Sequence, residues 1–218
     1  HHIQQQQQQQ QNNVYANINV NKLVAMFSLG ILRLISIKSV DYHEHTSEYG
    51  IHWNFFLTLA CVWFLADILH IVTKTPARNA FLGFILAVIH QFILLYNNNT
   101  DYLLNTNRIN IFLANREGLM SVSGLLPVYL LGEGFSYACL QGLKNFSRAS
   151  KFALASCLCW VLWIISSSMV QNTSRRLSNF AYGTITLAVT YLLLFSFQLA
   201  QTCFQDKIKY KHGKGDDY

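Results

Sequence analysis

The sequence predicts an all-α protein, a bundle of transmembrane helices with about six membrane spans. Apolar residues make up 52% of the 218 residues and charged residues only 12%, about half the charged share of soluble proteins. The apolar residues gather into runs of about 16 to 25 residues, close to the length that crosses a hydrocarbon core. Helices are expected because they satisfy their own backbone hydrogen bonds in lipid.

The predicted spans lie between a polar N-terminal segment and a charged tail. Residues 1–21 are rich in glutamine and asparagine, cannot bury an apolar face, and are expected to be disordered. Thr75-Pro76 marks a turn between two spans, because proline disfavours helix in the preceding residue. Residues 205–218 form the charged tail. Within the membrane domain 22–204, the predicted spans are approximately 22–37, 52–73, 77–96, 119–143, 149–170 and 177–204.

The net charge of +6 does not indicate nucleic-acid binding, because no basic stripe with interleaved aromatic residues is present. The basic residues lie mostly in loops and in the tail, where they report on membrane orientation. One side carries ten lysines and arginines and the other five. The richer side is predicted to be cytoplasmic, which places the 41–52 loop on the lumenal or extracellular side. A glycan on Asn145 would contradict this orientation, whereas one on Asn98 would agree with it.

The cysteines and histidines do not indicate a metal site. The five cysteines lie inside apolar runs and have no C-x-x-C spacing, so neither a disulfide framework nor a zinc site is predicted. His43, His45 and His52 with Glu48 match no established ligand spacing. No metal and no cofactor are therefore expected.

The densest group of titratable side chains is the stretch 41–56, which reads DYHEHTSEYGIHWNFF and enters the second span. Histidines and carboxylates supply general acid and base groups, and the membrane edge can shift their pKa values. The alternative is a solvated polar hairpin that joins two helices.

A second group of ionisable residues lies within the predicted spans. Such residues are costly in lipid and normally face a cavity or a partner. Arg33 and His90 lie towards the same side as the polar loop, where they would line a cavity beneath it. The alternative is that Arg33 extends to the interface and His90 bonds a neighbouring helix. The remaining members are Asp67, His70 and Glu133.

Two short motifs lie at predicted helix starts, Asn115-Arg116-Glu117-Gly118 and Ser174-Arg175-Arg176. Two adjacent arginines beside a helix N-terminus can hold a phosphate. Interfacial anchoring of the helix is the alternative interpretation.

The stretch LGILRLISIKSVDYHEHTSEYGIHWNFFLTLA resembles the signature region of the GPI-anchor inositol acyltransferases. These endoplasmic-reticulum enzymes acylate the inositol of glucosaminyl-phosphatidylinositol. Two further blocks agree, Asn115–Gly118 and Ser174–Asn179, and the three blocks occur in order. The resemblance covers roughly residues 22–200, the C-terminal half of the family's usual length. The matching residues of the first block are Arg33-Leu34, Asp41-Tyr42, Glu44-His45, Ser47-Glu48-Tyr49-Gly50 and His52-Trp53-Asn54-Phe55-Phe56.

The resemblance implies transfer of a long-chain acyl group from acyl-CoA, as co-substrate, to the inositol 2-hydroxyl in the endoplasmic-reticulum membrane. The family's usual catalytic residues, an aspartate and a lysine, lie in the N-terminal half, so no position here takes over their role. Glu133 departs from the family, which has an apolar or small residue there. The chain begins His-His-Ile without a methionine, so a fragment, a processed product or a mis-started product is expected.

The candidate catalytic residues are His52 and Glu48, and the expected partners are the glycolipid, acyl-CoA and the bilayer, with no nucleic acid. A transporter or channel subunit is an alternative, since intramembrane charges and glycine-broken helices also occur there. An inactive fragment with a structural role is another. The residues predicted to bind substrate are Arg33, Asp41, Glu44, His45, Tyr49, Trp53, Asn54, Asn115, Glu117, Arg175 and Arg176.

Overall fold

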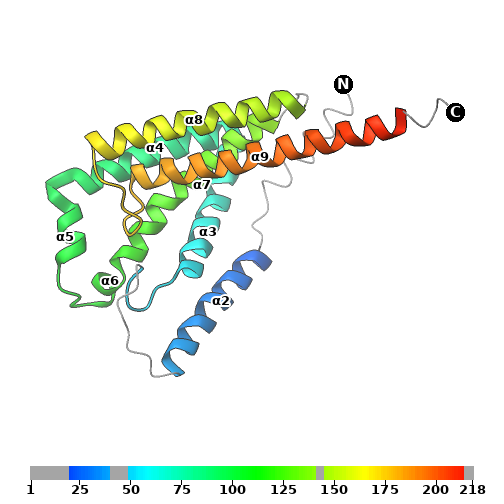
Figure 1. The fold of residues 1–218 in the computed structure, drawn as a ribbon. Helices are drawn as coiled ribbons and strands as arrows, with labels where there is room; N and C mark the ends of the chain where they lie inside the picture. The colour runs from blue at the N-terminus through cyan, green and yellow to red at the C-terminus, as the bar shows by residue number, and fades with distance from the viewer. Residues whose placement is uncertain (1–19, 40–48, 141–144, 214–218) are drawn as a thin grey trace.

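The computed structural model describes residues 20–39, 49–140 and 145–213, and within these ranges it contains helices and connections but no strand. Six of the helices are long and apolar enough to cross a membrane, which confirms the predicted fold class. In chain order (Figure 1) the helices are α2 (Val20–Ser39), α3 (Phe55–Thr73), α4 (Pro76–Leu95), η1 (Tyr96–Asn98), α5 (Asn99–Asn105), α6 (Ile111–Ala114), α7 (Arg116–Leu140), α8 (Asn145–Met169) and α9 (Phe180–Gly213).

The long helices overlap the six predicted spans, and local side chains fix where some of them begin. Helix α3 begins at Phe55, later than predicted, because the Asn54 side chain accepts hydrogen bonds from the second and third backbone N–H groups of the helix. Helix α4 begins at Pro76 after the capping residue Thr75, where the sequence predicts a turn. Helix α9 continues to Gly213, through much of the segment predicted as a charged tail.

Helices α4, α7, α8 and α9 form the body of the bundle (Figure 1). Helix α4 packs along α7, α8 packs along α9, α3 packs against α7, and α2 packs chiefly against α3. One buried cluster lies between α3 and α7 and the other joins α7, α8 and α9. Their buried members are Val62, Ala66, Leu126 and Leu130 in the first, and Cys139, Phe152, Leu187 and Tyr191 in the second.

Helices α4 and α7 approach each other closely because glycine lies at their contact. A Cβ atom added to Gly134 of α7 would come within 2.5 Å of the Ala80 Cβ atom and 2.6 Å of the Pro76 carbonyl oxygen on α4. Small residues at helix contacts allow such approach in membrane proteins. The tight α4–α7 pair supports the polar segments at the start of α7 and before α9.

Candidate functional site

The Tyr49–Asn54 segment, which leads into α3, lies against the start of α7. The Gly118 N–H donates to the Tyr49 carbonyl oxygen (2.7 Å), and the Ile51 N–H donates to that of Ala114 (3.1 Å). Gly50 has φ +121°, and a Cβ atom there would lie 2.6 Å from the Ala114 carbonyl oxygen. Only glycine combines this backbone conformation with so close an approach. The Tyr49–Asn54 segment is therefore fixed to α7 by its backbone.

Asn115 extends this attachment to the candidate catalytic residue. Its side-chain oxygen accepts a hydrogen bond from the His52 backbone N–H at 2.8 Å, and its amide nitrogen donates to the Ile111 carbonyl oxygen at 2.9 Å. Asn115 is buried, whereas His52 is exposed. The structure gives the His52 imidazole no hydrogen bond with any described residue, so its backbone is held while its ring faces outward.

Trp53 and Asn54 make contacts within the protein. The Trp53 indole N–H donates to the Thr58 hydroxyl at 2.8 Å. Asn54 is only 2% exposed, and its amide nitrogen donates to the Gly30 carbonyl oxygen of α2 at 3.0 Å, in addition to capping α3. The polar atoms of these two predicted substrate-binding residues are thus engaged in holding α2, α3 and the segment before α3 together.

Glu117 is the electrostatic centre of this end of the bundle. Its side chain is fully buried and three arginines surround it. Arg108 binds both carboxylate oxygens, with Nη1 3.0 Å from Oε2 and Nη2 2.5 Å from Oε1. Arg176 Nη2 donates to Oε1 at 3.0 Å, and Arg116 Nε lies 3.9 Å from it. One buried carboxylate therefore connects the segment between α5 and α6, which carries Arg108, with the start of α7 and the turn before α9.

The three arginines differ in their remaining contacts. Arg116 donates to the carbonyl oxygens of Thr106 (2.6 Å) and Leu104 (3.2 Å), and its side chain is 5% exposed. Arg108 also donates to a backbone carbonyl, that of Ala114, at 2.7 Å. The Arg176 side chain is 45% exposed. Arg176 is therefore the member of the group with the most surface available to a ligand.

The turn before α9, formed by Ser174–Asn179, is organised by Asn179, which is fully buried. Its side-chain oxygen accepts hydrogen bonds from the backbone N–H groups of Ser174 and Tyr182, both at 3.1 Å. Its amide nitrogen donates to the Asn172 carbonyl oxygen at 2.8 Å and to Gln171 Oε1 at 3.2 Å. This side chain closes the turn and caps α9, which positions the exposed residues Arg175 and Arg176.

Helix α4 anchors the same turn. His90 Nε2 donates to the Leu177 carbonyl oxygen at 2.9 Å, and because a carbonyl only accepts, this nitrogen carries the ring proton. His90 Nδ1 faces the Ser123 hydroxyl at 3.0 Å. The adjacent Gln91 accepts from the Phe180 N–H at 2.9 Å and donates to Gln171 at the same distance. His90 thus bonds a neighbouring segment, as one of its two sequence interpretations states.

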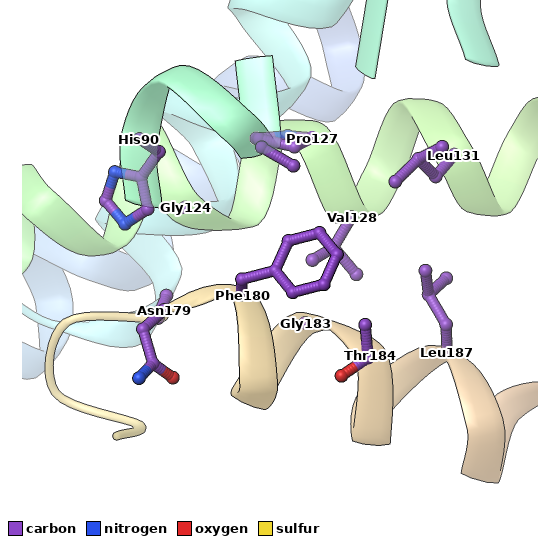
Figure 2. Close-up of a pocket in the computed structure, with 12 residues that line it drawn as sticks. His90, Gly124, Pro127, Val128, Leu131, Asn179, Phe180, Gly183, Thr184 and Leu187 are labelled. Carbon is purple, nitrogen blue, oxygen red and sulfur yellow. The ribbon is translucent and has the colours of Figure 1, made fainter. Parts of the chain in front are cut away.

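An apolar groove runs from this turn along the contact between α7 and α9, with α4 at its side. About 310 Å³ of space not filled by protein atoms lies in the groove and in the open space at its mouth. Figure 2 shows Val128 pointing from α7 towards α9 and the Phe180 ring lying between the two helices. The lining residues are Ala87, His90, Gly124, Pro127, Val128, Leu131, Ser178, Asn179, Phe180, Gly183, Thr184 and Leu187.

Several predicted site residues lie away from this assembly. Arg33 is on the exposed side of α2, is not among the groove residues, and forms no ion pair or hydrogen bond with any described residue. Its predicted role in binding substrate remains a prediction. Asp41, Glu44, His45 and Glu48 lie outside the described residues, so their predicted roles also remain predictions.

Sequence reasoning missed Arg108, Gln91 and Asn179. Arg108 is the single basic residue between Asn97 and Asn115, a signal that gains meaning only when its partner is known. Gln91 is uncharged, and its importance arises from contacts with Gln171 and Phe180, which are distant in the sequence. Asn179 ends the matched Ser174–Asn179 block, but its role in closing the turn and capping α9 requires the helix boundary to be known.

The comparisons with known proteins agree with the motif pattern. The GWT1 family model matches residues 1–217. The phosphatidylinositol-glycan biosynthesis class W protein of Dictyostelium discoideum is 36% identical over 175 residues, covering 78% of this chain and 34% of that protein. GPI-anchored wall transfer protein 1 of Kluyveromyces lactis is 33% identical over 197 residues, covering 87% and 43%. Its Saccharomyces cerevisiae counterpart is 30% identical over 210 residues, covering 83% and 41%.

The chain spans less than half the length of these curated relatives. The family model, in contrast, covers nearly all of the chain, including the three sequence blocks that meet around Glu117 and Asn115. The chain belongs to the GWT1 family.

Proposed function

We propose that this chain forms part of an acyltransferase of GPI-anchor biosynthesis in the endoplasmic-reticulum membrane. The reaction is transfer of a long-chain acyl group from acyl-CoA to the inositol 2-hydroxyl of glucosaminyl-phosphatidylinositol. Family membership supports this, since relatives are named for phosphatidylinositol-glycan biosynthesis and for GPI-anchored wall transfer. The observation that carries the proposal is the meeting of the three sequence blocks, through the His52–Asn115 and Glu117–Arg176 hydrogen bonds.

The chemistry requires a base, stabilisation of an oxyanion and exclusion of water. The inositol oxygen attacks the thioester carbonyl carbon, a C–O ester bond forms, and the C–S bond breaks. The hydroxyl proton passes through the base to the departing thiolate of CoA. We assign this proton transfer to His52 with Glu48, because the His52 ring faces outward from a backbone fixed to α7. The proposal includes no metal and no cofactor, and acyl-CoA is the co-substrate.

The phosphate of the glycolipid is proposed to bind at Arg175 and Arg176, with Arg33 as a further cationic partner. Three guanidinium groups around the single carboxylate of Glu117 leave an excess of positive charge at this end of the bundle. Guanidinium groups bind phosphate through paired, charge-assisted hydrogen bonds. Arg176 combines a fixed position with an exposed side chain, so it is the best placed of the group around Glu117.

The remaining predicted contacts are with the inositol and the sugar. Tyr49 and Asn115 border the His52 backbone, and Asp41, Glu44 and His45 belong to the segment that leads into it. We place this end of the bundle in the lumen, because the lysine and arginine count favours that orientation. Glycan attached at Asn98 and absent at Asn145 supports the placement, and the reverse pattern contradicts it.

Microsomes from cells that express the protein test the reaction. Incubation with labelled glucosaminyl-phosphatidylinositol and palmitoyl-CoA should give an acylated product. A phospholipase C that uses the inositol 2-hydroxyl as its nucleophile should not cleave this product. His52→Ala and Glu48→Ala should each abolish product formation, whereas Glu133→Gln at the other end of α7 should retain it. Near-normal product formation in both His52→Ala and Glu48→Ala would overturn the assignment of the base.

A further inference from the structure

The groove between α7 and α9 is formed by one matched face from each helix. Helix α7 contributes Gly124 and the residues three, four and seven positions later, and α9 contributes Phe180 and the same series. This spacing defines one face of a helix. Helix α9 packs mainly against α8 and only lightly against α7, which leaves this contact partly open. The lined length is about 10 Å, given the rise per helical residue.

The chemistry of the groove favours hydrocarbon. Its polar side chains are already bonded within the protein. His90 bonds Leu177 and Ser123, Thr184 donates to the Ala181 carbonyl oxygen at 3.0 Å, and Asn179 closes the turn before α9. Ser178 Oγ donates to the Arg175 carbonyl oxygen at 3.3 Å, and the other lining side chains are apolar or absent. A polar ligand would lose hydrogen bonds to water without replacement, whereas an alkyl chain loses none.

The position of the groove relates it to the proposed reaction. Its polar end is the Ser174–Asn179 turn, which also carries the arginines proposed to hold the acceptor phosphate. A reacting carbonyl must lie beside the acceptor hydroxyl, so an acyl chain attached to that carbonyl would start at this turn. One helix face on each side lines the groove, so the groove offers a single track, which suits one alkyl chain better than the paired tails of a phospholipid.

Resting on the proposed acyl transfer, we propose that the α7–α9 groove binds the fatty chain of the acyl donor and sets the chain length that the enzyme accepts. Gly183 and Phe180 are the specificity-determining positions. A Cβ atom at Gly183 would contact only the Val128 Cγ2 atom, at 2.9 Å, so a larger side chain there reduces the groove without meeting backbone. Phe180 lies between the two helices (Figure 2), and its truncation enlarges the groove.

The functional test compares acyl-CoA donors in microsomes. Gly183→Val should shift the kcat/KM ratio of lauroyl- to palmitoyl-CoA about tenfold towards the shorter chain, the scale of a methylene-sized change in an apolar pocket. Phe180→Ala should shift it the other way. Val189→Phe changes a lipid-exposed residue of the same helix and should leave the ratio unchanged. Gly183→Ala provides a smaller step in case the valine variant does not fold. Unchanged ratios in folded Gly183→Ala, Gly183→Val and Phe180→Ala would overturn the proposal.

A binding test separates the groove from the reaction. Purified protein in lipid nanodiscs is irradiated with an acyl-CoA that carries a diazirine on its alkyl chain. Label should concentrate in residues 124–131 and 180–187 and should be displaced by palmitoyl-CoA. Displaceable label in an inactive protein supports the groove while the proposed reaction fails. Active protein whose label is spread over exposed helix faces, or matches that from a diazirine phospholipid, overturns the groove and retains the reaction.

Discussion

Helix α7 carries one glutamate near each end, and the two have different partners. Glu117 is fully buried and contacts three arginines. Glu133, sixteen residues later and about 24 Å along the helix, has a side chain that is 20% exposed. It bonds His70 Nε2 at 2.7 Å and accepts from the Asn79 amide at 3.3 Å. The first glutamate is held by charges, and the second by hydrogen bonds from groups that can be neutral.

Glu117 and Glu133 illustrate two ways in which a helical membrane protein accommodates a carboxylate. A buried charge is costly without a partner, so Glu117 and its arginines depend on one another, and the three segments that supply them are tied together. Glu133 joins α3 and α4 to α7 where some solvent or headgroup access remains. Substitutions at this second site are therefore expected to be tolerated, which agrees with the apolar or small residue that the resemblance implies there.

The strongest test of this contrast is the pair Glu117→Gln and Glu133→Gln, which keep the side-chain size and remove the charge. Glu117→Gln should lower the free energy of unfolding by about 3–5 kcal/mol, the cost of breaking a buried ion pair. Glu133→Gln should cost about 1 kcal/mol, the scale of one hydrogen bond. Unfolding in mixed micelles measures both values. Equal losses in the two variants would show that burial of Glu117 carries no special cost.

A second test ranks the arginines around Glu117. Arg108→Met removes two hydrogen bonds to a buried carboxylate and should cost about 2–3 kcal/mol. Arg176→Met removes one from a side chain that is 45% exposed and should cost about 1 kcal/mol or less. In the microsomal assay, Arg176→Met should raise the KM for the glycolipid although it changes the free energy of unfolding little. A larger stability loss in Arg176→Met than in Arg108→Met would contradict the proposal that Arg108 supports the structure and Arg176 binds the ligand.

A third test uses two glycines of α7. A Cβ atom at Gly124 would overlap the Ser178 carbonyl oxygen and lie 3.0 Å from His90 Nε2, whereas one at Gly132 would have its nearest neighbour, Leu187 Cδ2, at 3.5 Å. Gly124→Ala should therefore destabilise by about 1–3 kcal/mol through overpacking. Gly132→Ala should stabilise by about 0.5–1 kcal/mol through its helix propensity. Stabilisation by both substitutions would show that the turn before α9 does not press against α7.

Much of the architecture follows from simple sequence signals. The six apolar runs predict the six long helices, and Thr75-Pro76 predicts where α4 begins. The start of α3 depends on Asn54, which caps the helix and also bonds Gly30 of α2. Its match to the family motif predicts substrate binding, whereas its capping role can be predicted only when the helix boundary is known.

The candidate site was predictable as a set of blocks but not as a set of contacts. The matched blocks contain Glu117 and Arg176, whose pairing across 59 positions no local pattern reveals. Arg108 lies outside every block and yet makes the most contacts with the carboxylate of Glu117. Such partners are fixed by the charge balance of a buried centre, which depends on distances between helices rather than on spacing along the chain.

The turn before α9 has a consequence for how the last two helices fit the bundle. Helices α8 and α9 pack closely on each other, and apolar surfaces alone would allow this pair to slide along α7 at little cost in lipid. The hydrogen bond that His90 donates to the Leu177 carbonyl oxygen and the one that Gln91 accepts from the Phe180 N–H can form in only one axial position of the pair. A shift of one helical turn, about 5.4 Å, would break them all. These hydrogen bonds therefore fix the axial position of the α8–α9 pair relative to α7.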